Sequence, residues 1–561
     1  MTPSLTRSLL TERHRPTLDR ATSALRERGH WSAYSENPRD YPREEGAAAF
    51  AALTDHRFEL DQPGTDDWVG GEISPYGPPL GISYPHPDPD VLLPAMRAAL
   101  PAWRDAGPEV RALVCAEILA RLAERTAELA HAVMHTTGQG YAMALQAGGP
   151  NALDRGLEAV ATALVEQTRH PAEAEWTKPR GRHQPLVVAS TFTPVPRGVA
   201  LLVGCRTFPT WNGYPGLFAS LATGNPVLVK PHPRAVLPLA LTVATARRVL
   251  AEAGFDPQLV ALAAERETEY GARALAVRDE IRIVDYTGSA AFGDWLEENA
   301  GQARVFTEKS GVNTVLLDST DDYRGLLSNL AFSLSLYSGQ MCTTPQNLLI
   351  PREGIGTDEG PKGFHEVVAD LAAAVDKLLA DEGRAASLLG AVAEPGVLSR
   401  VAAAAEAGEV ALASREFAHP EFPEGRVVTP LLVRLDGRRP GVERTLLAEW
   451  FGPVAFAVAT DSTAEALSLL RRTLRERGAL TVLGHTTSDE VEAALVDVCL
   501  DERAQLSLNL TGGVHVNQTA AFADYHGTGG NPAGNAALVE GAFVASRFHW
   551  AQVRRPGRPR G

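Results

Sequence analysis

The sequence of 561 residues contains only four cysteines, at Cys115, Cys205, Cys342 and Cys499, and no two of them form a CxxC pair. Zinc modules and disulfide-rich secreted domains need cysteines that are denser or more regularly spaced. The pattern therefore predicts no metal site and no disulfide framework. We expect reduced thiols in a cytoplasmic protein.

Positive charge and long apolar runs are also scarce. The chain has 53 Lys + Arg against 68 Asp + Glu, a net charge of −15, which argues against a nucleic-acid partner or attachment to an anionic membrane. No apolar run is long enough to cross a bilayer. The N-terminal MTPSLTRSLLTERHRP lacks the apolar core of a signal peptide. We expect neither nucleic acid nor membrane as a partner.

A chain of this length exceeds one ordinary core, so we expect two or more domains. After a polar stretch of about 90 residues, helical and extended patterns alternate, which predicts parallel α/β sheets. The expected helices are Thr17–Arg28, Val91–Trp103, Pro108–His135, Asn151–Gln167, Tyr214–Ala222, Leu237–Ala253, Tyr323–Leu336 and Pro361–Ala380. The expected strands are Val199–Val203, Pro226–Val229, Val260–Leu262, Ile281–Asp285, Thr314–Leu317, Asn347–Ile350, Val454–Ala459 and Ala479–Val482. The Pro-, Thr- and Val-rich Glu175–Pro196 predicts an extended hairpin or arm, and the final RRPGRPRG a disordered tail.

The most informative pair of residues is Cys342, in SGQMCTTP, and Glu308, in TEKSGVN. A lone cysteine is most often a buried structural residue, and Cys115, on the apolar side of a helical pattern, fits that role. The neighbours of Cys342 are instead small and polar, so a substrate could approach its thiol. A thiol and a nearby carboxylate can form a thioester and then hydrolyse it.

Four further motifs suggest ligand contacts, although each also has an ordinary structural explanation. Lys230, one of only five lysines, ends a predicted parallel strand, where ligands bind and where it could contact ribose or phosphate. Gly288 and Ser289 precede a helix whose N-terminus could hold a pyrophosphate, or could simply be capped. Asn212, beside Trp211, could stabilise an oxyanion or form a turn. In EWFGP, Glu449 and Phe451 could contact ribose and nicotinamide, or lead into a strand.

The order of these motifs resembles that of the aldehyde dehydrogenase superfamily over Val91 to Phe548. The segments TWN, VLVKP, YTGS, TEKSG, GQMCT and EWFGPV are similar to that family's PWN, VVKP, FTGS, ELGGK, GQ.C and EIFGPV, in the same order. The resemblance implies an α/β fold with a Rossmann-like cofactor domain, a catalytic domain and a β oligomerisation arm. The implied parts are 1–174 with 197–306 for cofactor, 175–196 for the arm, 307–510 for catalysis, and 511–561 returning to the cofactor domain or oligomer interface.

The resemblance also implies a role for each site residue. Cys342 would attack the aldehyde, Asn212 and the Cys342 N–H would stabilise the oxyanion, and Glu308 would activate water. The implied cofactor-binding residues are Lys230, Gly288, Ser289, Glu449, Phe451 and Trp211. A homodimer or homotetramer is implied, formed through the arm.

Departures from the family pattern suggest a branch. Pro233 stands where NAD-preferring members often carry a glutamate, so NADP is slightly favoured over NAD. The Asn212 to Lys230 gap is short, TEKSG adds a charge beside Glu308, and YHGTGGNPAG replaces PFGG.K.SG. Together with the long N-terminus, these features resemble the stand-alone phenylacetate-degradation, PaaN-type branch, which implies a coenzyme A-linked semialdehyde as substrate.

Two other functions stay open. A CoA-acylating dehydrogenase would pass the acyl group to CoA, but such a reaction needs no water-activating Glu308. A non-catalytic scaffold could keep the fold, but the intact Cys342, Glu308 and Asn212 argue against it.

Overall fold

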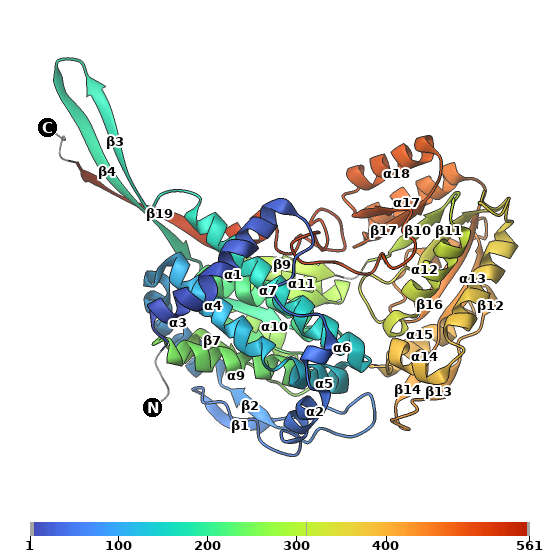
Figure 1. The fold of residues 1–561 in the computed structure, drawn as a ribbon, viewed down its shortest axis with the longest axis horizontal. Coiled ribbons are helices and arrows are strands. Elements are labelled where there is room, and N and C mark those ends of the chain that lie inside the picture. The colour runs from blue at the N-terminus through green and yellow to red at the C-terminus, as the bar shows by residue number, and fades with distance from the viewer. Residues whose placement is uncertain (1–4, 310, 558–561) are drawn as a thin grey trace.

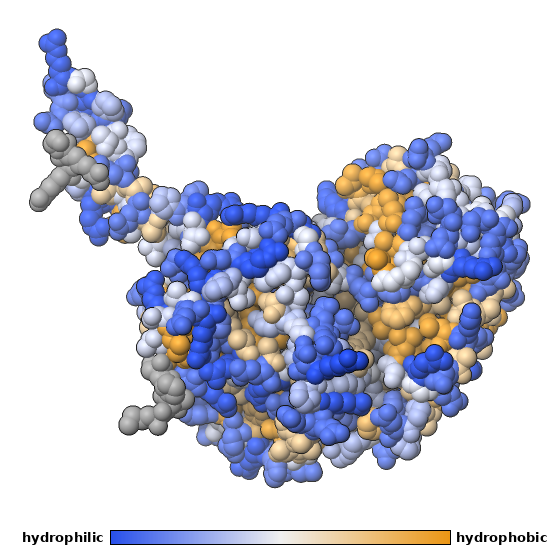
Figure 2. Space-filling model, in the orientation of Figure 1, coloured by the Kyte–Doolittle hydropathy of each residue, from blue (hydrophilic) through white to orange (hydrophobic). Residues whose placement is uncertain are grey.

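The computed structural model describes residues 5–309 and 311–557. Two α/β units lie side by side and a long β arm projects from the first (Figure 1). On the face drawn in Figure 2, hydrophobic residues gather on the second unit where it faces the first. Among the described residues, no helix is both long and apolar enough to span a membrane.

The sheet of the first unit is entirely parallel, in the order β7-β6-β5-β8-β9. Because helices cover both of its faces, its strands are nearly continuous apolar runs, as in the fully buried VALLV of β5. Strands β6 and β8 lie on opposite sides of β5, so the strand order reverses direction at β5. A crevice at such a topological switch point is where α/β sheets bind ligands. The strands are β5 (Val199–Val203), β6 (Val227–Lys230), β7 (Val260–Leu262), β8 (Ile281–Gly288) and β9 (Arg304–Lys309). The connecting helices are α8 (Pro209–Ala222), α9 (Leu237–Glu252), α10 (Gly271–Ala276) and α11 (Ala290–Asn299), with a 3₁₀ turn, η2, at Pro257–Leu259.

The residues before the arm form a helical layer on this unit. Helix α1 is longer than the expected Thr17–Arg28, because Leu10, His14, Leu18 and Ala21 continue one buried stripe around Pro16. The N-terminal elements are α1 (Arg7–Glu27), η1 (Pro38–Asp40), α2 (Arg43–Ala51), β1 (Thr65–Val69), β2 (Tyr84–Pro87), α3 (Pro89–Asp105), α4 (Gly107–Ala123), α5 (Thr126–Thr137), α6 (Tyr141–Gly148) and α7 (Pro150–Thr168).

The second unit contains a seven-stranded sheet, β12-β15-β16-β11-β10-β17-β18, which is parallel except for the edge pair β12 and β15. The expected strand Ala479–Val482 was placed too early, because Val482 begins the pairing with Thr314. The strands of this sheet are β10 (Thr314–Leu317), β11 (Asn347–Pro351), β12 (Glu409–Leu412), β15 (Leu431–Asp436), β16 (Val454–Thr460), β17 (Val482–His485) and β18 (Leu506–Leu508). A separate hairpin pairs β13 (Glu416–Ala418) with β14 (Arg426–Val428). The helices are α12 (Tyr323–Ser335), η3 (Leu336–Gly339), α13 (Phe364–Leu378), α14 (Glu382–Leu389), α15 (Pro395–Ala405), α16 (Val442–Leu446), α17 (Thr463–Arg477) and α18 (Asp489–Asp501). The two-unit α/β architecture confirms the expected fold class.

The projecting arm is a three-stranded antiparallel sheet, β19-β4-β3 (Figure 1). Its strands are β3 (Glu173–Arg180), β4 (His183–Pro196) and β19 (Phe548–Pro556). The prediction of a disordered C-terminal tail was wrong for Arg554–Pro556, because these residues pair with Val188–Ser190. The last four residues of that tail lie outside the described residues. Before β19, a long segment containing α19 (Gly541–Ala545) returns from the second unit to the first.

Candidate active site

Glu308 lies at the carboxyl end of the edge strand β9. Its backbone is fixed on both sides, by Thr287 of β8 and by a bridge to Gly534 of the returning C-terminal segment. The carboxylate is buried, and Asn212 Nδ2, in the first turn of α8, donates to its Oε2 at 3.0 Å. Two elements of the first unit therefore fix both the position and the orientation of this acid.

Cys342 follows a strained turn in the second unit. Tyr337 and Ser338 have φ values of 53° and 48°, in the left-handed region that costs energy for residues with a side chain. A Cβ on Gly339 would lie 2.3 Å from the Gly452 carbonyl oxygen, so glycine permits the close approach of the EWFGP turn. Asn313 Nδ2 then donates to the Cys342 carbonyl oxygen at 2.8 Å. These contacts fix the cysteine at the boundary between the units.

A histidine that the sequence reasoning missed completes the cluster. His526 Nε2 lies 3.0 Å from Glu308 Oε1 and 3.9 Å from Cys342 Sγ. The His526 and Glu308 side chains are only 3% and 6% exposed. His526 belongs to the YHGTGG segment that departs from the family pattern, and if YHGT is set against PFGG it takes the place of the phenylalanine. That departure was the available signal, but no spacing rule connects a residue 184 positions from Cys342 to its thiol.

The environment of this cluster shifts the pKa values of Cys342 and Glu308 in opposite directions. Burial, together with the negative charge of Glu308, raises the pKa of the Cys342 thiol well above its usual value. Burial also acts to raise the pKa of Glu308, but the charge and hydrogen bond of His526, together with hydrogen bonds from Cys342 and Asn212, outweigh burial and hold that pKa below its usual value. The resting cluster therefore holds a neutral thiol beside an ionised carboxylate, and the thiol needs a proton acceptor before it can attack.

Aromatic and ionic contacts position His526. The rings of Trp211 and His526 pack edge to face, with their centroids 4.8 Å apart. The guanidinium of the buried Arg155 lies over the same Trp211 ring and also binds Asp524, two residues before His526. Helices α7 and α8 thus orient a histidine supplied by the C-terminal segment.

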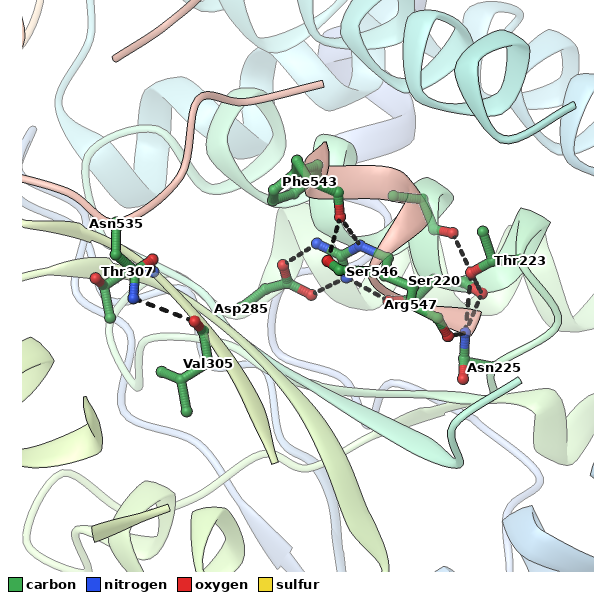
Figure 3. Close-up of polar contacts among 11 residues, drawn as sticks. Ser220, Thr223, Asn225, Asp285, Val305, Thr307, Asn535, Phe543, Ser546 and Arg547 are labelled. Atoms are coloured by element: carbon green, nitrogen blue, oxygen red, sulfur yellow. Dashed lines mark hydrogen bonds and ion pairs between the residues drawn. The ribbon is translucent and has the colours of Figure 1, made fainter. Parts of the chain in front are cut away.

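The same segment is anchored further along by Arg547, whose side chain is fully buried (Figure 3). Its guanidinium forms a two-point ion pair with Asp285 of β8 and donates to Ser220 Oγ at 2.7 Å. Closer to Glu308, Asn535 Oδ1 accepts from the Thr307 N–H at 2.8 Å. The C-terminal segment therefore supports both Glu308 and His526.

Two cavities meet at the thiol. The smaller, of about 350 Å³, and the larger, of about 600 Å³, share Cys342, Asn212 and Phe208 in their linings. The larger cavity extends to Trp31 of the N-terminal segment, and no lysine or arginine is among its described lining residues. The smaller cavity is lined by charged residues that include Arg206 and Arg400.

Four of the six expected cofactor residues, Gly288, Ser289, Glu449 and Phe451, line the smaller cavity. Ser289 is the N-cap of α11 but makes no capping hydrogen bond through its side chain, so that its hydroxyl can bind a ligand at the helix N-terminus. With two arginines nearby, this lining fits a dinucleotide. The structure does not bring the other two to this cavity: Trp211 lines the larger one, and Lys230 is buried in an ion pair with Glu265.

The ion pair with His526 predicts a specific pH response. We expect His526→Phe, which keeps an aromatic ring beside Trp211, to move the acid limb of turnover that reflects Glu308 to higher pH. The pKa rises in the variant because His526 is the largest of the groups that lower it, and only the weaker hydrogen bonds of Cys342 and Asn212 then remain against burial. The ionised Glu308 also stabilises the fold above its unfolded pKa, and this stability is lost as the pH falls through the lowered folded pKa.

The pH profile of kcat in wild type and variant checks this expectation. His515→Phe is the matched control, because His515 lines the same large cavity but is not in the cluster. Coincident acid limbs for His526→Phe and wild type would contradict the role of His526.

Comparisons with known proteins show the family of this chain. The aldehyde dehydrogenase family model matches residues 87–475. A crystal structure of an NAD-dependent aldehyde dehydrogenase from Burkholderia multivorans is 51% identical, with a TM-score of 0.95, and the match covers 98% of this chain and 99% of that one. At 19% identity, a 1-pyrroline-5-carboxylate dehydrogenase from Thermus shares the fold, with a TM-score of 0.70 over 92% of this chain and 96% of that one.

Among curated proteins, an N-succinylglutamate 5-semialdehyde dehydrogenase from Chromobacterium violaceum is 29% identical over 47% of this chain. The matched part spans about half of that relative, 51% of its length. From the family match over most of the chain, together with the cluster at the junction of two cavities, we conclude that this protein belongs to the aldehyde dehydrogenase family.

Proposed function

We propose that this protein oxidises an aldehyde to a free carboxylic acid with NAD or NADP, through a thioester on Cys342. The observation that carries this proposal is the place of Cys342 Sγ, where a charged cavity and a larger cavity meet beside the buried Glu308. One cavity would hold the dinucleotide and the other the aldehyde.

In this proposal the chain's own groups act in sequence. The Cys342 thiol releases its proton to solvent water in the cavities and attacks the aldehyde carbon as a thiolate. Asn212 Nδ2 turns from Glu308 to the developing oxyanion, which the Cys342 N–H also binds, and frees the carboxylate. A nicotinamide bound in the smaller cavity would accept the hydride. Glu308 then takes a proton from the water that attacks the thioester, and the acid leaves.

The role of Glu308 separates hydrolysis from the CoA-acylating alternative. We expect Glu308→Gln to retain a first burst of reduced nicotinamide and to slow steady turnover by about 10²–10⁴-fold, because general-base catalysis supplies about that much. Stopped-flow absorbance resolves the burst from the steady rate. Asp294→Asn, which alters an exposed carboxylate on Lys309 rather than the cluster, is the matched control. Full steady turnover in Glu308→Gln without added CoA would refute the hydrolytic mechanism.

The substrate we propose is a semialdehyde linked to coenzyme A, of the kind formed in phenylacetate-type aromatic catabolism. A cavity of about 600 Å³ has the volume for a long acyl chain and part of a pantetheine arm. Because its described lining has no lysine or arginine, the CoA phosphates would remain outside. The same lining gives no cationic anchor for the free carboxylate of an unlinked semialdehyde.

For the cofactor, Pro233 favours NADP, whereas the partly exposed Glu265 favours NAD. Glu265 is the ion-pair partner of Lys230, the residue that the resemblance assigns to ribose, and so supplies a carboxylate next to Lys230. That carboxylate can accept hydrogen bonds from ribose hydroxyls and would repel a 2′-phosphate. We therefore propose NAD as the preferred cofactor, although the sequence alone slightly favoured NADP.

The arm supports the proposal of a homodimer or homotetramer. Its strands expose Trp176, Leu186, Trp550 and Val553, each at least 40% accessible. Exposed apolar residues along β strands are typical of surfaces that pair with another chain.

The deciding experiment follows reduced-nicotinamide absorbance with NAD or NADP and no free CoA. The aldehydes are a CoA-linked semialdehyde, the corresponding free semialdehyde and simple uncharged aldehydes. Signal with the CoA-linked compound supports the proposal. Signal with simple aldehydes alone keeps the mechanism but removes the substrate, and signal that appears only after CoA is added supports the acylating alternative.

A further inference from the structure

The donor atoms of Cys342, His526 and Glu308 converge on one point. Cys342 Sγ, His526 Nε2 and a Glu308 carboxylate oxygen all lie within 4.8 Å of one another. The reaction described above uses the ion pair of His526 with Glu308 but gives no role to the approach of the same nitrogen to the Cys342 thiol. We propose that these three residues form a binding site for Zn²⁺ that reversibly blocks the enzyme.

The separations match those of a tetrahedral zinc site. With Zn–S near 2.3 Å and Zn–N and Zn–O near 2.0–2.2 Å, ligand atoms are spaced by about 3.6 Å for sulfur to nitrogen and about 3.4 Å for nitrogen to oxygen. The observed separations are 3.9 Å for Cys342 Sγ to His526 Nε2 and 3.0 Å for His526 Nε2 to Glu308 Oε1. The third separation, from Cys342 Sγ to a Glu308 carboxylate oxygen, is within 4.8 Å, so small side-chain shifts would close the site.

The ligand types select the metal. One thiolate, one imidazole and one carboxylate suit Zn²⁺, whereas Mg²⁺ and Ca²⁺ require oxygen ligands throughout. Three protein ligands leave a fourth position, and here Cys342 faces both cavities, so water can fill it. Surrounding contacts hold the ligands in place: Asn212 donates to Glu308, and Trp211 packs on the His526 ring.

The site was invisible to cysteine spacing because its ligands are far apart in the chain. Glu308, Cys342 and His526 come from an edge strand of the first unit, a turn of the second and the returning C-terminal segment. Binding of Zn²⁺ displaces the proton of the Cys342 thiol to solvent and occupies the sulfur lone pair that would otherwise attack an aldehyde. The block of catalysis rests on the proposed function, whereas metal binding rests on geometry alone.

The test measures binding on the cofactor-free protein with no substrate, so a wrong substrate does not affect it. Co²⁺ serves as the spectroscopic probe, and Zn²⁺ is then titrated in to displace it. We expect a thiolate-to-cobalt charge-transfer band and tetrahedral visible bands, both abolished by Zn²⁺. His526→Phe should weaken Zn²⁺ binding by more than about tenfold, since even an outer partner of a ligand is worth about 10–100-fold.

His515→Asn is the matched control, because it removes a histidine of the same cavity that does not belong to the cluster, and it should bind Zn²⁺ as wild type does. A second measurement needs no variant: Zn²⁺ should protect Cys342 from iodoacetamide in wild type, and a chelator should restore the labelling. Absence of the charge-transfer band, equal Zn²⁺ affinity in a folded His526→Phe, or unprotected Cys342 would each overturn the proposal.

Discussion

Replacing Cys342 with alanine should abolish aldehyde oxidation while the dinucleotide still binds. Removing a catalytic nucleophile costs at least about 10⁴-fold in rate, because no other group can form the covalent intermediate. Another thiol, Cys205, cannot substitute, since burial raises its pKa to about 12 and it lines the smaller cavity but not the larger one. The steady-state rate measures the loss, and calorimetric titration with NAD measures the binding.

Cys499→Ala provides the matched control. Cys499 is buried in the apolar core of the second unit, away from the cluster. The Cys499→Ala variant should retain activity, while Cys342→Ala should not. Wild-type rates in Cys342→Ala would rule out the thioester mechanism, and loss of NAD binding in that variant would indicate that the change had damaged the cofactor cavity instead.

Arg547→Leu should destabilise the first unit by about 3–5 kcal/mol, since removing one partner of a buried ion pair leaves the other charged and unpaired. Asp285 would lose both of its guanidinium contacts, and Ser220 and the Phe543 carbonyl would also lose a donor. Thermal and chemical denaturation of the folded variant measure the effect. Because the C-terminal segment also supplies His526, turnover should fall together with the stability of the Arg547→Leu variant.

The double variant Arg547→Leu with Asp285→Leu tests the cause. Without the buried carboxylate the uncompensated charge is gone, so the double variant should be more stable than Arg547→Leu alone. Arg554→Leu, in the exposed part of β19, is the control for loss of an arginine and should change stability by less than about 0.5 kcal/mol. If the double variant were no more stable than the single one, the ion pair would not explain the anchoring.

The sequence predicted the parts of the site that lie in ordered motifs. Cys342, Glu308 and Asn212 do come together, and most strands of both sheets lie close to where apolar runs predicted them. These features could be predicted because a buried parallel strand leaves a local signature and because motif order survives sequence change. Their catalytic roles stay predictions.

His526, Glu265 and the final strand could not be found in the same way. The position of His526 depends on a segment that crosses from one unit to the other, and its partners are contacts between distant residues. Lys230 was expected to face the cofactor, but its ion-pair partner Glu265 lies 35 positions away with no motif to connect them. The last strand was mistaken for a tail because β19 is exposed on both faces along most of its length and shows no buried stripe.

The meeting of two cavities at a single sulfur atom bears on the order in which products can leave. In the proposed mechanism an acyl group on Cys342 would extend into the larger cavity and the dinucleotide would occupy the smaller one, so neither would have to pass the other on its way to solvent. A spent dinucleotide could therefore depart before or after the acid, and overlap between the two ligands would not impose a fixed sequence of release.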